Sequence, residues 1–179
     1  MGSLDLLKVK RIENSKLFIK AKQLDNLAIV ESIKRKFQKN GISAEKIITE
    51  GKSKTKEEML KKYNQIDIAL DPFPYSGVTT SLEANWMGVP LLTKKGNNFY
   101  SRIGTSINKN LKMEDWIAND EKDYILKAIS KVSDLKKLFQ IKRELRNNFL
   151  KSPLCNTKQY AKHFENCLNS MWKTYLEKK

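Results

Sequence analysis

The sequence predicts an α/β fold, a parallel sheet with helices on both faces, followed by a helical C-terminal third. Short apolar runs alternate with segments whose apolar residues recur at helical spacing, which is typical of parallel sheets. Beyond residue 101 the helical spacing continues almost without interruption. At 179 residues the chain is long enough for one hydrophobic core, so we expect a single domain over residues 4–179. Residues 1–3, Met-Gly-Ser, are expected to be an addition to the natural chain.

The part of the chain before residue 64 contains helix and strand signals in turn. Gly41 is placed to end a helix, because glycine readily adopts the left-handed conformation found just past helix ends. Thr55 and Glu58 have the spacing of a capping box, which predicts the start of another helix. In chain order we expect a helix over 4–12, a strand over 16–20, a helix over 27–37, a strand over 46–49 and a helix over 55–63.

The next part centres on a strand, a loop and a helix. A short apolar run over 66–70 predicts a strand, and a Pro- and Gly-rich loop follows over 72–77. A helix with a hydroxyl-rich first turn then opens at Thr79 and ends near Gly88, and another strand is expected over 89–93. This geometry directs free backbone N–H groups and the positive end of a helix at one point, which predicts a phosphate site.

The amino-acid sequence of this region gives evidence for a nucleotide site beyond the predicted strand, loop and helix. Residues 71–90 read D-P-F-P-Y-S-G-V-T-T-S-L-E-A-N-W-M-G-V-P, and this segment resembles the nucleotide-binding core of the O-GlcNAc transferase family, glycosyltransferases that use UDP-sugars. The resemblance runs from about residue 12 to residue 172. Further matching motifs lie at 96–106 (G-N-N-F-Y-S-R-I-G-T-S), 116–118 (W-I-A), 152–154 (S-P-L), 158–160 (K-Q-Y) and 171–172 (M-W).

The resemblance implies the C-terminal, nucleotide-sugar-binding lobe of a GT-B glycosyltransferase of the bacterial type, with a Rossmann-like sheet. It implies an inverting, metal-independent enzyme that acts on protein or peptide acceptors. In the family this lobe opens with a central strand before the motif matched by residues 14–17, and an N-terminal lobe supplies the catalytic histidine. Neither is found in these 179 residues, so we expect a lobe truncated at its N-terminus, without catalytic residues and inactive alone.

The resemblance also implies which residues bind the nucleotide. Thr79 and Thr80 match threonines that contact the β-phosphate, and Glu83 matches the family's ribose-contacting aspartate. Lys56 matches a lysine near the uridine, and Lys62 a basic position in the same helix. Two further positions, Met59 and Val78, depart from the family because histidines stand there in other members.

No metal or cofactor is expected. Asp67 and Asp71 lie four positions apart, which is not the D-x-D spacing of metal-dependent glycosyltransferases. Cys155 and Cys167 have only His163 between them, too few ligands for a metal site. His163 is expected to be a surface or packing residue. The developing diphosphate charge would therefore be stabilised by a helix N-terminus and cations, with the UDP-sugar as substrate.

Two other readings stay open. The net charge of +15 favours polyanions, although no nucleic-acid-binding module is recognisable and the lysine-rich composition is also typical of AT-rich coding. A nucleotide-binding or interaction domain without catalysis is the second alternative. With neither a secretory signal nor a membrane-spanning apolar run, a cytoplasmic location is expected.

Two apolar stripes mark the C-terminal helices, and stripes of this kind are typical of helices that pack into a core. The second stripe, on residues 158–176, carries more apolar surface than one lobe is expected to cover. We therefore expect an exposed apolar patch and concentration-dependent self-association. The two stripes are Leu138, Ile141, Leu145 and Phe149, and Tyr160, Phe164, Leu168, Met171 and Tyr175.

Overall fold

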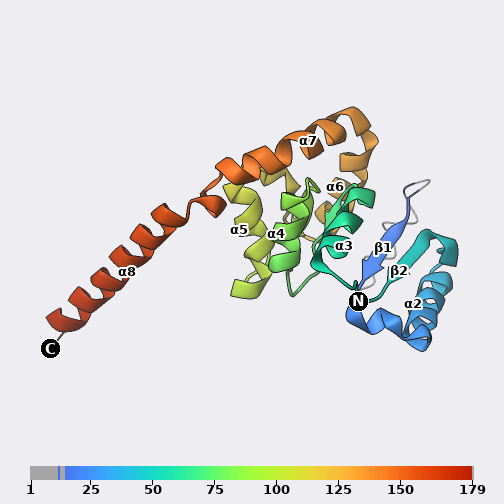
Figure 1. Cartoon of the computed structure of the whole chain (residues 1–179), viewed down its shortest axis with the longest axis horizontal. Coiled ribbons are helices and arrows are strands. Elements are labelled where there is room, and N and C mark those ends of the chain that lie inside the picture. Colours follow the sequence, from blue (N-terminus) through green and yellow to red (C-terminus); the bar gives the residue numbers. More distant parts are fainter. Residues whose placement is uncertain (1–11, 13–14, 179) are drawn as a thin grey trace.

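The structure, a computed structural model, describes Ile12 and residues 15–178. It confirms parallel strands flanked by helices, with a mainly helical C-terminal third (Figure 1). The helix expected over 4–12 lies almost entirely outside the described residues. The elements are β1 (Leu17–Lys20), α2 (Leu27–Lys39), β2 (Ile47–Glu50), α3 (Lys56–Lys61), β3 (Ala69–Leu70), α4 (Thr79–Trp86), β4 (Leu91–Lys94), α5 (Ile103–Asn110), β5 (Ile117–Ala118), α6 (Glu121–Ser133), α7 (Leu135–Lys151) and α8 (Thr157–Glu177).

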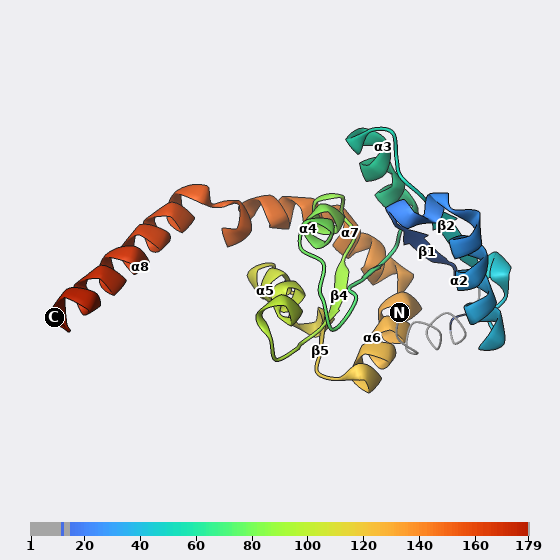
Figure 2. The same ribbon diagram turned by 90° about the horizontal axis from the view of Figure 1, so that it is seen from below.

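The strands form two parallel sheets. In the first, β1 pairs with β2, with Leu17 opposite Ile47. In the second, the order is β3-β4-β5, with Ala69 opposite Leu91. In both views β1 lies on the side of β2 that faces the rest of the molecule (Figures 1 and 2). A doubly wound sheet has the order 3-2-1-4-5-6, and the two sheets match the strands on either side of position 1. No strand of the described residues occupies that central position.

Local sequence signals set the ends of several elements as expected. Thr55 and Glu58 form the capping box at the start of α3. Gly41 and Gly88 follow α2 and α4 with φ of 75° and 77°, a left-handed conformation that glycine adopts without strain. The strand expected over 66–70 is shorter than predicted, because only its last two residues pair with β4.

The hydrophobic core is divided in the same way as the sheet. The larger cluster lies under β4 and β5, against α5, α6 and α7, and includes the fully buried Tyr124. The smaller cluster has three buried residues, Phe37, Ile42 and Ile47, which pack between α2 and the sheet of β1 and β2. The buried members of the larger cluster are Leu92, Ile107, Leu111, Met113, Trp116, Ala118, Tyr124, Ala128, Leu138, Leu145 and Phe149.

The two C-terminal helices differ in how they use their stripes. The stripe of α7 packs into the larger cluster, as predicted. The expectation that the stripe of the last helix is also core is wrong for the described chain, because every residue of α8 is exposed. The helix extends away from the body (Figures 1 and 2), so its apolar face is not packed against the body formed by the other described residues. The expected exposed apolar patch is therefore present on α8.

None of the helices in the described part of the chain has both the length and the hydropathy that a membrane span requires.

Candidate nucleotide site

The start of α4 is the candidate phosphate site. The loop from β3 delivers the chain to Val78, whose φ of −107° and ψ of −81° place it outside the helix, and α4 begins at Thr79. No described side chain caps this turn, and Thr79 and Thr80 are exposed. The first backbone N–H groups of a helix have no partner within the helix, so this turn presents donors and positive potential to an anion.

Asp71, at the carboxyl end of β3, holds the loop in place. Its side chain is buried, and its two oxygens accept hydrogen bonds from the Gly77 N–H at 2.8 Å and the Thr93 hydroxyl at 2.6 Å. The Tyr124 hydroxyl donates to the Asp71 carbonyl at 3.0 Å. Burial raises the pKa of the Asp71 carboxyl, and its hydrogen bonds oppose the shift. Asp71 therefore links the sheet to the residue two positions before Thr79.

Close packing explains two glycines beside this site. A Cβ on Gly77 would lie 2.7 Å from the hydroxyls of both Thr80 and Ser81. A Cβ on Gly104, in α5, would collide with the side chains of Asp71 and Thr93. The absence of a side chain at both positions therefore leaves room for the close packing around Asp71.

Two of the predicted residues meet on one side of α4. Lys56, at the start of α3, forms an ion pair of 3.2 Å with Glu83, whose side chain is only 14% exposed. The Tyr63 hydroxyl donates to the Thr80 carbonyl at 3.2 Å, which joins the segment after α3 to the same turn of α4. Burial, with a contribution from Glu83, raises the pKa of Tyr63 to about 12, so the phenol stays neutral and a donor.

The other predicted residues lie around this centre. Lys62 pairs with Glu50 at 3.0 Å, and Glu50 also accepts a hydrogen bond of 2.9 Å from Lys20. These contacts, that from Lys20 first, lower the pKa of the Glu50 carboxyl. Met59 is half-buried on α3 and Val78 is 44% exposed before α4. The structure thus brings Lys56 to Glu83, whereas Lys62 is engaged at the end of β2.

Several residues at the same sheet edge were not among the predicted ones. The spacing of Asp71 from Asp67 argues against a D-x-D metal site, but it gives no sign that Asp71 anchors the loop. The Lys94 ammonium, at the end of β4, lies 4.1 Å from the Phe73 ring centroid. The rings of Tyr75 and Tyr100 stack at 5.7 Å, and the Ser76 N–H donates to the Tyr100 carbonyl at 3.2 Å. These contacts tie the loop over 72–78 to the motif over 96–106.

The described residues contain no group of three or more His, Cys, Asp or Glu side chains that could hold a metal ion. Asp67 instead pairs with Lys142 at 3.1 Å, while Asp71 is enclosed by its hydrogen bonds. Cys155 and Cys167 are free, and His163 is exposed on α8.

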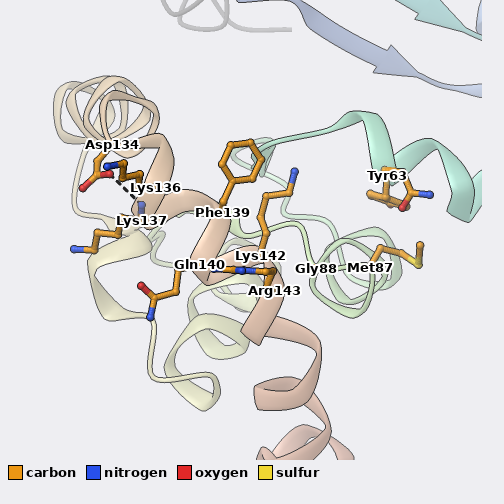
Figure 3. A pocket seen from close by; sticks show the side chains of 11 residues that line it. Tyr63, Met87, Gly88, Asp134, Lys136, Lys137, Phe139, Gln140, Lys142 and Arg143 are labelled. Atoms are coloured by element: carbon orange, nitrogen blue, oxygen red, sulfur yellow. Dashed lines mark hydrogen bonds between the residues drawn. The ribbon is translucent and has the colours of Figure 1, made fainter.

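A hollow of about 1070 Å³ includes residues that follow the C-terminal end of α4, and Figure 3 shows the side chains that line it. It is lined by Met87 and Gly88 after α4, by Tyr63 and Asn64, and by the first turns of α7. None of the seven predicted nucleotide-binding residues lines it. The phosphate site at Thr79 is therefore an exposed helix end and lies apart from this hollow.

Known proteins share both the fold and the motif of this site. The model of glycosyl transferase family 41 matches residues 8–164. The chain belongs to this family. The fold is similar to the solved structure of a point mutant of the O-GlcNAc transferase from Thermobaculum terrenum, with a TM-score of 0.88 at 27% identity, covering 94% of this chain and 32% of that one. The fold is thus the C-terminal lobe of a GT-B enzyme, as predicted.

Relatives in family 41 include plant proteins named as probable UDP-N-acetylglucosamine–peptide N-acetylglucosaminyltransferase SPINDLY. That of Solanum lycopersicum is 36% identical over 118 residues, 66% of this chain and 13% of the relative. That of Hordeum vulgare is 28% identical over 170 residues, 93% of this chain and 18% of the relative. This chain therefore spans less than a fifth of the length of these curated relatives, and it is an O-GlcNAc-transferase-like glycosyltransferase domain.

Proposed function

We propose that this chain is the lobe that binds the donor nucleotide, a UDP-sugar, in an inverting and metal-independent glycosyltransferase acting on protein or peptide acceptors. The observation that carries the proposal is the uncapped start of α4, where Thr79 and Thr80 are exposed and Asp71 fixes the preceding loop. This turn lies at the carboxyl end of a parallel sheet, the edge at which such folds bind ligands.

Each predicted residue has a role in this proposal. The N–H and hydroxyl groups of Thr79 and Thr80 donate to the β-phosphate, and Glu83 accepts from the ribose beside Lys56. Lys62 adds positive charge near the base, with Met59 against the ring face and Val78 at the loop end. A hydrogen bond to a charged phosphate contributes about 1.5–3 kcal/mol. No described residue is needed as a metal ligand.

Calorimetric titration with UDP tests this proposal. The double substitution Thr79→Ala and Thr80→Ala should weaken UDP binding at least about tenfold, which corresponds to about 1.4 kcal/mol, while EDTA should leave affinity unchanged. Thr157→Ala with Thr174→Ala is a matched control, because both threonines lie on exposed α8. A requirement for magnesium, or unchanged affinity in the first double variant, would contradict the proposal. GDP in place of UDP reports on base specificity.

We further propose that these 179 residues transfer no sugar alone. Orientation of two reactants contributes about 7–11 kcal/mol to barrier lowering, and this requires an acceptor site and a general base. The histidine of the chain, His163, is exposed on α8, a helix that extends away from the body in both overall views (Figures 1 and 2). An assay of purified protein with a UDP-sugar and peptide should show no product, and robust transfer would refute this point.

Self-association is the remaining part of the proposal. The apolar residues of α8 are exposed, with Trp172 at 59% and Tyr160 at 69%, although some of their rings stack on one another within the helix. Isolated helices are marginally stable in water, so α8 gains stability when this face is covered. Sedimentation over a wide concentration range should show growing oligomers, whereas a monomer throughout that binds no hydrophobic dye would contradict it.

A further inference from the structure

The hollow at the far end of α4 is a second surface with its own chemistry. Met87 and Gly88, which follow α4, are among its lining residues (Figure 3). Tyr63 also lines the hollow, and its hydroxyl contacts the Thr80 carbonyl. An α-helix rises about 1.5 Å per residue, so the lining residues Met87 and Gly88 lie roughly 12 Å along α4 from its first turn. A ligand could therefore occupy it independently of the donor nucleotide.

The charges around the hollow are strongly unbalanced. Four cations line it, against one carboxylate, that of Asp134. Lys142 is already engaged, since its ammonium donates to the Ile66 carbonyl at 2.8 Å and pairs with Asp67. Among the described residues, the other three cations have no acidic side chain within ion-pair distance. These three are Lys136, Lys137 and Arg143. The hollow therefore favours a ligand with several negative charges.

An exposed aromatic ring lies among these cations. Phe139 is 54% exposed, three positions after Lys136 and four before Arg143, so the three residues share one face of α7. Figure 3 shows Phe139 between the lysines near the start of α7 and the side of the hollow formed by Tyr63 and Met87. The amide side chains of Gln140 and Asn64 add hydrogen-bonding groups to the lining. A positively charged groove with an accessible ring is the arrangement that binds single-stranded nucleic acids, in which bases stack on aromatic side chains.

We propose that this hollow binds single-stranded nucleic acid, with phosphates at Lys136, Lys137 and Arg143 and a base stacked on Phe139. An acidic peptide would match the charge but would make no specific use of the exposed ring, so the nucleic acid is favoured. Three phosphate contacts give a slope of roughly −2 for log affinity against log salt concentration, taking about 0.7 per contact for single strands. This site is separate from the proposed donor site and does not depend on it.

Fluorescence anisotropy with a labelled single-stranded 12-nucleotide RNA and the DNA of the same sequence tests the proposal on the whole chain. The triple substitution Lys136→Glu, Lys137→Glu and Arg143→Glu should weaken binding at least about a hundredfold through lost phosphate contacts and new repulsion. The matched control is Lys158→Glu, Lys162→Glu and Lys173→Glu. It changes the net charge by the same amount on exposed α8 and should weaken binding less than about threefold.

The ring is tested separately from the charges. Phe139→Ala should weaken binding about tenfold, and Phe139→Trp should restore it, because stacking needs a ring. Phe139 is largely exposed, so thermal unfolding should be unchanged in both variants. Equal losses in the two triple variants would show binding through net charge only and would overturn the proposal. Competition by poly-glutamate as effective as that by unlabelled RNA, or no change in Phe139→Ala, would overturn it as well.

Discussion

The two sheets of this chain differ in how much core supports them. We call β1, α2 and β2 the small unit, and β3 to β5 with α4 to α7 the large unit. The cluster of the large unit includes the fully buried Tyr124 and buried residues of α5, α6 and α7, whereas the cluster of the small unit has three buried members, Phe37, Ile42 and Ile47. Because burial of apolar surface is the main stabilising contribution, the large unit is expected to be the more stable of the two.

The backbone pairing shows that each sheet has an edge strand without a partner on one side among the described residues. The Ala21 N–H donates to the Glu50 carbonyl, so the alternate residues Phe18 and Lys20 direct their backbone groups away from β2. In the same way, the N–H groups of Ala69 and Asp71 bond to the β4 side, and Leu70 is directed away from it. Both sheets thus have an edge that no described strand covers. Within the described part of the chain, both uncovered edges face the same central position between the two sheets, and the core is divided at the same place.

The proposed donor site connects the two units. Lys62 reaches back to Glu50 at the end of β2, while Lys56 and Tyr63 reach forward to α4. The segment over 56–65 is therefore held at both ends, and nucleotide affinity should depend on the small unit although the phosphate contacts belong to the large one.

The largest effect on stability is expected from removing one buried phenylalanine ring from the core of each unit. Phe149→Ala and Phe37→Ala each remove a buried ring, which costs about 3–5 kcal/mol of the free energy of unfolding. In the large unit the loss should lower the stability of all its elements together. In the small unit the loss should exceed the local free energy of unfolding. The backbone amides of residues 17–50 should then exchange, while those of residues 91–149 stay protected. Hydrogen exchange followed by mass spectrometry measures both.

Phe164→Ala is the control for that pair, because this ring is 55% exposed on α8 and its removal should leave exchange in both units unchanged. If Phe37→Ala destabilised the two units equally, the chain would unfold as one cooperative body and the comparison would be wrong.

A smaller effect is expected at Asp71, within the large unit. Asp71→Ala leaves the half-buried Gly77 N–H and the buried Thr93 hydroxyl without an acceptor, at a cost of about 1–3 kcal/mol. Asp71→Asn keeps the size of the side chain but removes its charge, so it tests the contribution of the charge alone. Because burial raises the pKa of Asp71 above its usual value of 3.8, folding disfavours the ionised form. This penalty is absent below the usual pKa and complete above the raised one. The wild type should therefore lose stability relative to Asp71→Asn as the pH rises.

Urea unfolding of the wild type and Asp71→Asn between pH 3 and pH 7 measures that difference. A stability difference that does not change with pH would show that Asp71 titrates with its usual pKa and is not desolvated by the loop.

Much of this architecture could be predicted from the sequence, because local signals determine it. The capping box at Thr55, the left-handed glycines at 41 and 88 and the hydroxyl-rich start of α4 were all confirmed at the expected positions. The motif over 71–90 also led to the correct family. The seven nucleotide-binding residues remain predictions, although the structure does bring Lys56 to Glu83.

What the sequence did not reveal depends on contacts between distant segments. The role of Asp71 requires Thr93 and Tyr124 to meet it, and these partners are 22 and 53 positions away. The division of the sheet and core is a tertiary property that periodicity does not express. The apolar stripe of α8 has the same spacing as that of α7, so a sequence pattern alone cannot tell that one is buried and the other exposed.

The smallest effect is expected at Glu50, where the small unit meets the segment before β3. Lys20 and, to a lesser extent, Lys62 lower the pKa of this carboxyl, so its ionised form stabilises the fold. That contribution is complete above the ordinary pKa of 4.5 and is lost as the pH falls through the lowered folded value. Partly exposed pairs contribute about 0.2–1 kcal/mol each, so Glu50→Gln should cost about 1 kcal/mol at neutral pH.

The loss at Glu50 should shrink as the pH falls below 4.5, because the stabilising contribution of the ionised form is lost there. The control is Glu57→Gln, which breaks the exposed pair with Lys61 inside α3 and should change stability by less than about 0.5 kcal/mol. Urea unfolding at pH 7 and pH 3 measures both variants, and UDP titration reports whether the segment over 56–65 has lost its position. A weaker affinity for UDP in Glu50→Gln, with Glu57→Gln unchanged, would show that the small unit positions the donor site. Equal affinities would show that the large unit positions it alone, because the contacts of Lys56 and Tyr63 with α4 would then suffice.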